Sequence, residues 1–365
     1  MTERESQIYE WIKEDPMISQ QEIADRAGIT RSSAAVHISN LMKKGMIRGK
    51  GYVLTEENYV TVVGAVNIDI SGTPYDSLKS EDSNPGHLEI SFGGVGRNVA
   101  DNLCRLGASV QMITALGDDF YETELEKNFR SIGLEFRHSL KVAGSRTSTY
   151  LCVNTAAGDM SVAISDMDIY EKLTPEFMET RIPIINKGQY LVIDDNLPKE
   201  TIEYLAERST VPIVAAPVST TKVMKYADVL DRIYLMKPNR LELGALSGIE
   251  VTDDKSAERA GQVLLDRGVQ HLVISLGGKG ALYMTKGRKR YFPCLPGKLV
   301  NTTGCGDAMT GAIVWSLMKG REVEESVPYG LAAAAVCMEV NGAVNTQMSE
   351  TAIADRMKLT QEVIA

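Results

Sequence analysis

The alternation of strand and helix signals from residue 60 onward constrains the fold of this chain more than any other feature. Short runs rich in valine and isoleucine are followed, in most cases, by segments with helical periodicity. The predicted strands cover residues 60–66, 110–115, 190–193, 211–215, 233–236 and 271–275, and the helices cover residues 96–106, 121–132, 199–208, 240–246 and 257–267. This order predicts an α/β domain built on a largely parallel sheet.

One pair of segments breaks the alternation. Residues 148–153 and 160–164 are strand-like and flank a turn at residues 155–159, which predicts a β-hairpin. Residues 68–70 and 87–91 add further strand-like pieces. We expect these segments, near residues 68–91 and 145–166, to form a small second sheet that serves as a lid or as a dimer surface.

Composition excludes several classes of protein. No apolar run approaches the ~20 residues that a membrane-spanning helix needs, and the polar start Met1–Glu5 does not resemble a signal peptide. The five cysteines are scattered and form no CxxC pair, which argues against a zinc cluster or a disulfide framework. A net charge of −9 argues against a surface that binds nucleic acid over its whole area. We therefore expect a cytoplasmic protein without a membrane partner.

Residues 1–54 form a predicted small module, joined by a polar linker at 55–59 to a large domain at 60–365. Ser19 and Glu22 have the spacing of a capping box, Gly28 predicts a turn, and Thr30 predicts the cap of a third helix. Residues 46–54 are typical of a small β-hairpin. Residues 26–50 carry several Lys and Arg and no Asp or Glu.

Three helices followed by a basic hairpin resemble a winged helix-turn-helix domain, whose third helix enters the DNA major groove. The resemblance implies contacts to bases or phosphates, and thus operator DNA as a partner. The candidate DNA-binding residues are Arg31, Ser32, Ser33, Lys43, Lys44 and Lys50. The alternative is a packing or oligomerisation module with a solvated basic face.

A glycine-rich turn at Gly304-Cys305-Gly306-Asp307 precedes a long helical run. Free N–H groups and the positive end of the helix dipole would make an anion hole there. Asp307 would be placed to take a proton from a substrate hydroxyl while these amides bind a phosphoryl group. The alternative is a structural turn in which Asp307 only caps the helix.

Two further motifs suit a sugar. Asn67 and Asp69 are two residues apart on an extended segment and therefore point to the same side. A carboxylate there can accept hydrogen bonds from two vicinal hydroxyls. Gly94, within the run 93–98, would allow close backbone approach to the sugar, with Asn98 as a hydroxyl partner.

Two other motifs suit a nucleotide and its metal ion. Asn239 and Glu242 lie on one face of a predicted helix start, where they would hold water around Mg²⁺. Ser275, Gly277 and Gly278 follow a strand in a turn that would lie against a nucleotide.

In this order, the five motifs resemble the ribokinase-like (PfkB) family of sugar and nucleoside kinases over about residues 60–345. The resemblance implies a three-layer α/β/α core with a small β-sheet lid, and a homodimer that often forms through the lid. It implies transfer of the ATP γ-phosphoryl group to a primary hydroxyl, with Mg²⁺ as cofactor and Asp307 as the base. Amides of Gly304, Cys305 and Gly306 would form the anion hole.

The resemblance also assigns the binding residues. The sugar would be bound by Asn67, Asp69, Gly94 and Asn98, and Mg²⁺ and phosphate would be organised by Asn239 and Glu242. The nucleotide site would include Asn239, Ser275, Gly277, Gly278 and Asn345. Thr149, in the polar lid segment, and Asn196, at the end of a core strand, are further pocket candidates. Asn301 stands where many relatives have Asp, which leaves activation by K⁺ open.

Within the family the chain most resembles bacterial pseudouridine kinases, through runs such as 63–70, 82–86 and 117–121. That implies ATP-dependent phosphorylation of the pseudouridine 5′-hydroxyl. Short polar groups in the lid segment suit a uracil-like edge. Two alternatives remain: a kinase for another nucleoside, ribose or fructose, and a metabolite-sensing transcription factor built on a kinase fold.

Overall fold

The computed structural model describes residues 1–47, 58–157 and 159–364 and shows a three-layer α/β/α body. Within these residues the central sheet has eight strands in the order β14-β13-β12-β11-β10-β9-β1-β4. All neighbours from β12 to β4 run parallel, whereas β13 is antiparallel to both β12 and β14. The strands are β1 (Tyr59–Val63), β4 (Ser109–Ile113), β9 (Tyr190–Asp194), β10 (Ile213–Ala216), β11 (Ile233–Met236), β12 (His271–Ser275), β13 (Ala281–Thr285) and β14 (Arg288–Phe292).

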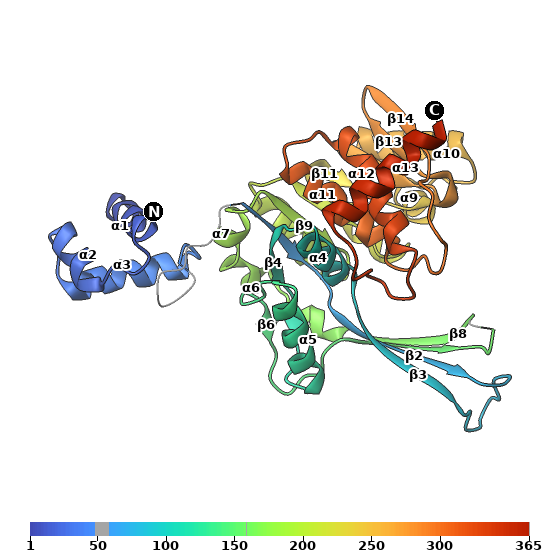
Figure 1. The fold of residues 1–365 in the computed structure, drawn as a ribbon, viewed down its shortest axis with the longest axis horizontal. Helices are drawn as coiled ribbons and strands as arrows, with labels where there is room; N and C mark the ends of the chain where they lie inside the picture. The colour runs from blue at the N-terminus through green and yellow to red at the C-terminus, as the bar shows by residue number, and fades with distance from the viewer. Residues whose placement is uncertain (48–57, 158, 365) are drawn as a thin grey trace.

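Helices cover both faces of this sheet (Figure 1). Val60 and Val62 of β1 belong to the core on one face, whereas Tyr59 and Val63 belong to the core on the other. Burial on both faces explains why the strands read as continuous apolar runs. The first face is covered by α4 (Val95–Arg105), α5 (Phe120–Ser131), α11 (Cys305–Met318), α12 (Val323–Cys337) and α13 (Glu350–Ile364), and the second by α6 (Pro175–Glu179), α7 (Ile182–Ile185), α8 (Lys199–Arg208), α9 (Arg240–Ser247) and α10 (Asp254–Asp266).

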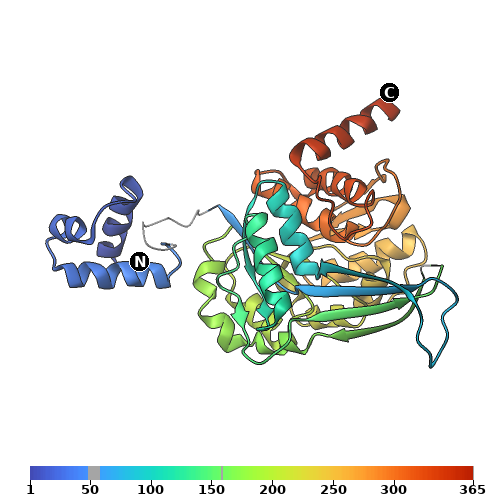
Figure 2. The ribbon, with the colours of Figure 1, turned by 60° about the horizontal axis from the view of Figure 1, so that its bottom comes forward.

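The predicted second sheet is present and extends away from the body (Figures 1 and 2). Its strand order is β3-β2-β7-β8, with β2 (Asn67–Pro74), β3 (Gly86–Gly93), β7 (Thr149–Asn154) and β8 (Met160–Asp166). The β7–β8 pair is the antiparallel hairpin expected from the sequence. A two-strand ladder of β5 (Ala115–Leu116) and β6 (Leu140–Lys141) lies beside α5.

The register gives this lid sheet two different faces. One row across the sheet contains Ser91, Asp69, Tyr150 and Ser165, and is polar. The next row, on the opposite face because side chains alternate along a strand, is apolar. It consists of Ile90, Ile70, Leu151 and Ile164.

The N-terminal residues fold as three helices: α1 (Glu3–Glu14), α2 (Gln20–Ala27) and α3 (Arg31–Lys43). The predicted capping box of Ser19 and Glu22 forms, Gly28 is left-handed with φ 62°, and Thr30 caps α3. The module meets the body where Gly45 packs against Ile184. The predicted hairpin at 46–54, Lys50 included, lies mostly outside the described residues, as does most of the linker at 55–59.

One strand end differs from the prediction. The predicted strand at residues 60–66 is divided in the structure: β1 ends at Val63, and β2 begins at Asn67. A Cβ on Gly64 would lie 2.4 Å from an oxygen of Asp194, so the chain passes this carboxylate too closely for any larger residue. Within the described ranges, no helix has the length and hydrophobicity that crossing a membrane requires.

Candidate active site

The first turn of α11 has the features of an anion hole. Its N-cap, Gly304, is left-handed with φ 78° and provides no side-chain cap. Within the described chain, the N–H groups of Gly304, Gly306 and Asp307 have no hydrogen-bond partner, whereas Cys305 N donates to Thr302 O at 3.2 Å. Unpartnered amides at the positive end of a helix dipole favour a negatively charged ligand.

Asp307 is positioned by a chain of side chains from α4. Asn98 Nδ2 donates to Asp307 Oδ2 at 2.7 Å. Arg97 donates to Asn98 Oδ1, which fixes the amide so that its nitrogen faces Asp307. Arg97 is itself held by an ion pair of 2.9 Å with Asp101. Burial raises the pKa of Asp307 to about 6, against the opposing effects of Asn98 and Lys237, so the carboxyl is a base suited to neutral pH.

Asp69 and Asn67 project from β2 on the same face of the lid sheet. Burial raises the pKa of Asp69 to about 6, and the charge of Arg97 opposes this rise. The Asp69 carboxylate lies over Gly93, where a Cβ would be only 2.0 Å from Oδ2. Asn67 Oδ1 accepts hydrogen bonds from Ser148 Oγ at 2.8 Å and from Tyr170 OH at 3.1 Å. Its Nδ2 has no partner among the described residues.

The backbone around Gly94 is held by a buried carboxylate. Asp194 accepts hydrogen bonds from Ala65 N and Gly96 N, both at 2.8 Å, and so joins the end of β1 to the start of α4. Gly94 has φ 93°, and a Cβ there would lie 2.4 Å from Ala65 O. Asn196 follows Asp194, and its Oδ1 accepts a hydrogen bond of 2.6 Å from Lys222 Nζ.

Asn239 and Glu242 form a capping box at the start of α9. Asn239 Oδ1 accepts hydrogen bonds from Leu241 N and Glu242 N at 2.9 Å, and Glu242 Oε2 accepts one from Asn239 N at 2.8 Å. Asn239 Nδ2 and Glu242 Oε1 have no hydrogen-bond partner among the residues that the structure describes, so they are available to a ligand. In the part of the chain that the structure describes, no three His, Cys, Asp or Glu side chains are grouped to hold a metal ion. An amide and a carboxylate such as those of Asn239 and Glu242 are donors that suit an Mg²⁺ ion that keeps several of its waters.

Four of the five predicted nucleotide residues share one cleft with the anion hole. A cleft of about 580 Å³ is lined by Asn239, Ser275, Gly277 and Gly278 together with Cys305 and Gly306. The rest of its lining is largely apolar and includes Leu295, Leu299, Met309 and Met338. Such a lining suits a planar base, and the polar end lies at the start of α11.

Three residues named in the sequence analysis either lie away from this cleft or already have hydrogen-bond partners. Both ends of the Asn345 amide bind backbone, at Val336 O and Gln347 N, and it lines a separate hollow. Thr149 is in register with Ile68, on the lid face opposite to Asp69. Asn301 donates to Asn341 O at 2.6 Å and accepts from Thr303 N at 3.0 Å.

Three groups that the sequence did not single out belong to this site. Lys237 is only 8 % exposed, and its Nζ lies 3.3 Å from where a Gly306 Cβ would be. Arg97 is buried between Asp69, Asp101 and Asp307. Tyr150 is in register with Asp69. The alternation of side chains along the strand could have indicated Tyr150, whereas only the fold brings the two cations to the carboxylates.

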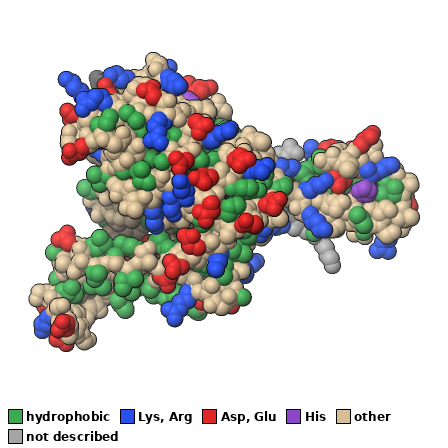
Figure 3. Space-filling model, turned by 180° about the vertical axis from the view of Figure 1, so that it is seen from behind, with side chains coloured by type: hydrophobic (Ala, Val, Ile, Leu, Met, Phe, Trp, Pro, Cys, Tyr) green, Lys and Arg blue, Asp and Glu red, His purple; other side chains and the backbone are tan. Residues whose placement is uncertain are grey.

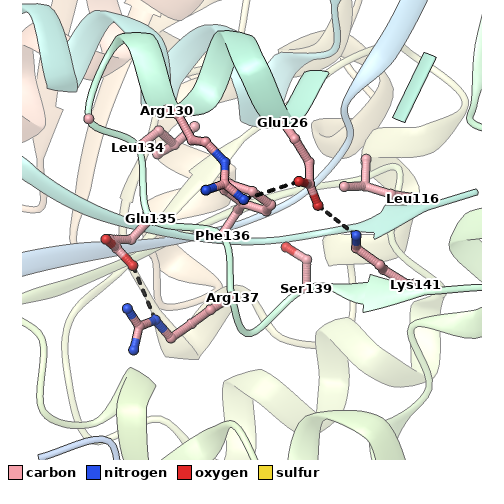
Figure 4. A pocket seen from close by; sticks show the side chains of 10 residues that line it. Leu116, Glu126, Arg130, Leu134, Glu135, Phe136, Arg137, Ser139 and Lys141 are labelled. Atoms are coloured by element: carbon pink, nitrogen blue, oxygen red, sulfur yellow. Dashed lines mark hydrogen bonds and ion pairs between the residues drawn. The ribbon is translucent and has the colours of Figure 1, made fainter. Parts of the chain in front are cut away.

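A second large hollow, of about 570 Å³, lies between α5 and β6 (Figure 4). Its cations face carboxylates of the same hollow. Arg130 binds Glu126 at 3.2 Å, Lys141 binds Glu126 at 2.6 Å, and Arg137 binds Glu135 at 3.2 Å. None of the predicted catalytic or binding residues lines it, so the site at α11 is the better candidate.

Comparison with known families identifies the family of each part of the chain. The sequence model of the pfkB family of carbohydrate kinases matches residues 57–351. A model of winged helix-turn-helix DNA-binding domains matches residues 1–48.

Individual relatives agree with the family match. The chain is 33 % identical to the uncharacterized sugar kinase YeiI of Escherichia coli over 347 residues, which cover 94 % of this chain and 96 % of the relative. It is 33 % identical to the pseudouridine kinase of E. coli over 298 residues, which cover 81 % and 95 % of the two chains. The crystal structure of a putative sugar kinase from Clostridium perfringens superposes with a TM-score of 0.75 at 26 % identity, covering 84 % of this chain and 97 % of the other.

Proposed function

The chain belongs to the pfkB family of carbohydrate kinases, and from this premise we propose that it phosphorylates the 5′-hydroxyl of pseudouridine with ATP. The observation that carries the proposal is the hydrogen-bonded chain from Arg97 through Asn98 to Asp307, set beside unpartnered amides at the start of α11. The likeness to a pseudouridine kinase over 81 % of the chain supports the substrate.

Each group has a separate task in the transfer. Asp307 takes the proton of the attacking hydroxyl. The hydroxyl oxygen bonds to the γ-phosphorus of ATP while the bond from this phosphorus to the β-phosphate oxygen breaks, and ADP leaves. The amides of Gly304, Gly306 and Asp307 hold the charge on the phosphoryl oxygens, and Lys237 adds a buried positive charge beside Gly306. The Cys305 amide joins them only if it gives up its bond to Thr302 O.

Glu242 and Asn239 would hold Mg²⁺ through its water ligands, and the ion would supply positive charge that offsets the charge of the ATP phosphates. The nucleoside sugar would be bound by Asp69, which accepts hydrogen bonds from two hydroxyls, and by the free Asn67 amide nitrogen. Gly94, which has no Cβ, leaves the sugar close to the backbone. Ser275, Gly277 and Gly278 would lie along the nucleotide in the apolar cleft.

Turnover on a panel of substrates tests the assignment. Purified protein with Mg²⁺ and ATP is offered pseudouridine, uridine, cytidine, inosine, adenosine, ribose and fructose, and ADP release is measured. We expect kcat/KM for pseudouridine to exceed that for every other compound at least about tenfold, the scale that hydrogen-bonding pockets reach easily. Preference for another compound would replace the substrate and leave the role of Asp307 intact.

A second candidate function is transcriptional regulation, because residues 1–48 match a DNA-binding family. Arg31, Ser32 and Ser33 are exposed at the start of α3, and Lys43 is exposed at its end. Lys44, in contrast, forms an ion pair of 2.6 Å with the buried Glu5. We infer that residues 1–54 bind operator DNA through the exposed groups, and that Lys44 mainly stabilises the module.

Salt dependence tests the DNA proposal. Affinity should fall steeply with salt, and Lys43→Ala should weaken binding to all sequences and reduce the salt slope by about 1. Lys13→Ala, at the end of α1, is the matched control. Binding that does not respond to salt would favour the module as a packing element.

The outer face of the lid supports a homodimer. Leu88, Ile90, Val162 and Ile164 are 78 %, 58 %, 53 % and 64 % exposed and share one face of the lid sheet. Figure 3 shows apolar side chains gathered over this extension. An exposed apolar sheet face of this kind is typical of a protein interface. We propose that two lids pack through it, and that Ile90→Glu gives a monomer in light scattering while Met224→Glu, on the body, does not.

A further inference from the structure

The lid sheet joins the body at a small buried cluster of polar side chains around Asn67, the first residue of β2. The other two members are Ser148, which directly precedes β7, and Tyr170, on the short 3₁₀ helix Asp168–Lys172 that follows β8. Asn67, Ser148 and Tyr170 are only 7 %, 2 % and 1 % exposed. The cluster thus lies where three of the lid strands leave the body (Figure 1).

Tyr170 is held at both ends of its side chain. Its ring is packed in the core on the second face of the central sheet. Its hydroxyl accepts a hydrogen bond of 2.7 Å from Val66 N. The same hydroxyl lies 2.6 Å from Val66 O and 3.1 Å from Asn67 Oδ1, the two acceptors for its one proton. Because packing fixes the ring, the hydroxyl is a fixed point against which the start of β2 is set.

These contacts decide which end of the Asn67 amide is free. Ser148 Oγ lies 2.8 Å from Asn67 Oδ1, nearer than the 3.2 Å that separates it from Asp166 O. Both hydroxyls are therefore at the amide oxygen, and Asn67 Nδ2 has no partner among the described residues. An amide NH₂ group only donates hydrogen bonds, so the free end of Asn67 suits an oxygen atom of a ligand.

Asn67 and Asp69 offer a sugar opposite kinds of group from the same face of β2. The ionised Asp69 carboxylate only accepts hydrogen bonds, whereas the free Asn67 nitrogen only donates them. One sugar hydroxyl can therefore donate to Asp69 while a neighbouring sugar oxygen accepts from Asn67. An Asn67 amide turned by half a rotation would present a second acceptor and would lose this complementarity.

We propose that Tyr170 and Ser148 are positioning residues for substrate binding, whose hydroxyls hold the Asn67 amide so that its nitrogen donates to an oxygen of the bound sugar. This inference rests on the proposed function, in which Asn67 binds the sugar. Tyr170 and Ser148 are too deeply buried to contact the substrate, so they act through Asn67. The base is oriented separately, by Asn98 from α4. Loss of either hydroxyl therefore weakens nucleoside binding and leaves kcat nearly unchanged.

Two conservative variants test the proposal. Tyr170→Phe and Ser148→Ala each remove one hydroxyl and keep the rest of the side chain. Binding of pseudouridine to the full chain is measured by calorimetry without ATP, and kcat and KM are measured in the turnover assay. We expect each change to raise Kd and KM for the nucleoside about fivefold, the equivalent of about 1 kcal/mol for one hydrogen bond. The values of kcat and of KM for ATP should stay within about twofold of the parent.

Tyr226→Phe is the matched control. Tyr226 is also fully buried in the same core, and its hydroxyl donates to the strand carbonyl Ile193 O at 2.8 Å. The two phenylalanine variants should lower the urea midpoint by similar amounts, but only Tyr170→Phe should change KM for the nucleoside. An equal change of this KM in both variants would reveal a general effect of destabilisation and would overturn the positioning role.

A double-mutant cycle shows whether Tyr170 acts through the amide. In the Asn67→Ala chain there is no amide to hold, so adding Tyr170→Phe should raise Kd by less than about twofold. A further fivefold loss would overturn the proposal, because Tyr170 would then affect the nucleoside by another route. Asn67→Asp keeps an oxygen for both hydroxyls and puts a second oxygen in place of the nitrogen. Binding by Asn67→Asp that equals the parent's would contradict the orientation of the amide.

The substrate assignment and this inference can fail separately. The cycle is measured with the compound that the turnover panel selects, so preference for ribose or another nucleoside changes the titrated ligand and leaves the expectation the same. Unchanged binding in Asn67→Ala would remove Asn67 from the sugar site, and this inference with it. A strong loss in Asn67→Ala without any loss in Tyr170→Phe and Ser148→Ala would overturn only the positioning role.

Discussion

The helices α9 and α11 begin at the same cleft, yet their first turns differ in what they offer a ligand. Asn239 and Glu242 use their side chains to satisfy the first amides of α9. Gly304 cannot do this, so the amides of Gly306 and Asp307 remain unpartnered. Because side chains already satisfy the first amides of α9, the uncapped turn of α11 is the better candidate of the two for the proposed anion site.

Lys237 lies between the starts of α9 and α11 and interacts electrostatically with a carboxylate of each helix. Its charge interacts with Glu242 of α9 and with Asp307 of α11, and burial lowers its pKa. The capped helix α9 therefore contributes its side chains to the proposed site, through the charge of Glu242 near Lys237 and through Asn239 at the edge of the cleft. We therefore expect substitutions in the first turn of α11 to change turnover strongly, and substitutions in the first turn of α9 to change it less.

The largest effect is expected for Asp307→Asn. The change removes the base and keeps the size of the side chain, so kcat should fall at least about 10²-fold while ATP and nucleoside still bind. Single-turnover kinetics and binding measurements separate the two. Asp101→Asn, which leaves the base in place and only weakens the support of Arg97, is the control. Near-normal turnover of Asp307→Asn would remove the distinction between the two helices.

The second effect is a loss of activity in acid. The pKa values of Asp307 and Asp69 are both raised to about 6, and the ionised forms accept the proton and the hydroxyl hydrogen bonds. Activity is therefore present above pH 6 and falls as the pH drops through it, by about tenfold from pH 7 to pH 5 for each group. The pH profile of kcat/KM measures this. In Asp69→Asn the fall from pH 7 to pH 5 should be only about tenfold instead of about 10²-fold, and an unchanged profile would contradict the assignment.

A smaller effect is expected when the cap of α9 is removed. Asn239→Ala should cost about 1 kcal/mol of folding free energy, the usual value of an N-cap. Asp253→Ala removes the corresponding cap of α10 and should cost about the same. Only Asn239→Ala should also lower kcat, by several-fold, because Asn239 lines the cleft. Denaturation curves and turnover of both variants decide the matter. Equal turnover would confine Asn239 to a capping role.

Much of this architecture could be predicted because local signals agree with the fold. The predicted strands at 233–236 and 271–275 and the predicted helix at 199–208 coincide with β11, β12 and α8. Each is an apolar or amphipathic run with clear ends. The hairpin of β13 and β14 was not predicted, because its strand β14 (Arg288–Phe292) is mostly charged and exposed.

The site was predictable where a motif lies within one segment and less so where it depends on distant contacts. The run 304–307 indicated its own geometry, because glycine conformation and helix start are local. Arg97 precedes Asn98 in the sequence, but only the register of β2 with β3 and the packing of α4 on α11 bring it near Asp69 and Asp307. Similarly, the sequence indicated Thr149 as a pocket residue, whereas the pairing of β7 with β2 places Tyr150 beside Asp69.

A last effect concerns stability and not turnover, and it is a gain in stability from the same Asp307→Asn change that lowers kcat. The folded-state pKa of about 6 is above the ordinary value of 3.8, so the folded chain holds this proton more tightly than the unfolded chain does. Ionisation at neutral pH therefore costs stability, on the order of 1–3 kcal/mol for a half-buried carboxyl. The cost is full above pH 6, shrinks as the pH falls from 6 toward 4, and is absent below it. Urea midpoints at pH 7.5 and pH 4 measure the gain, with Asp231→Asn, at an exposed position, as control. A variant no more stable than its parent at pH 7.5 would show that the uncapped turn already compensates the charge of Asp307.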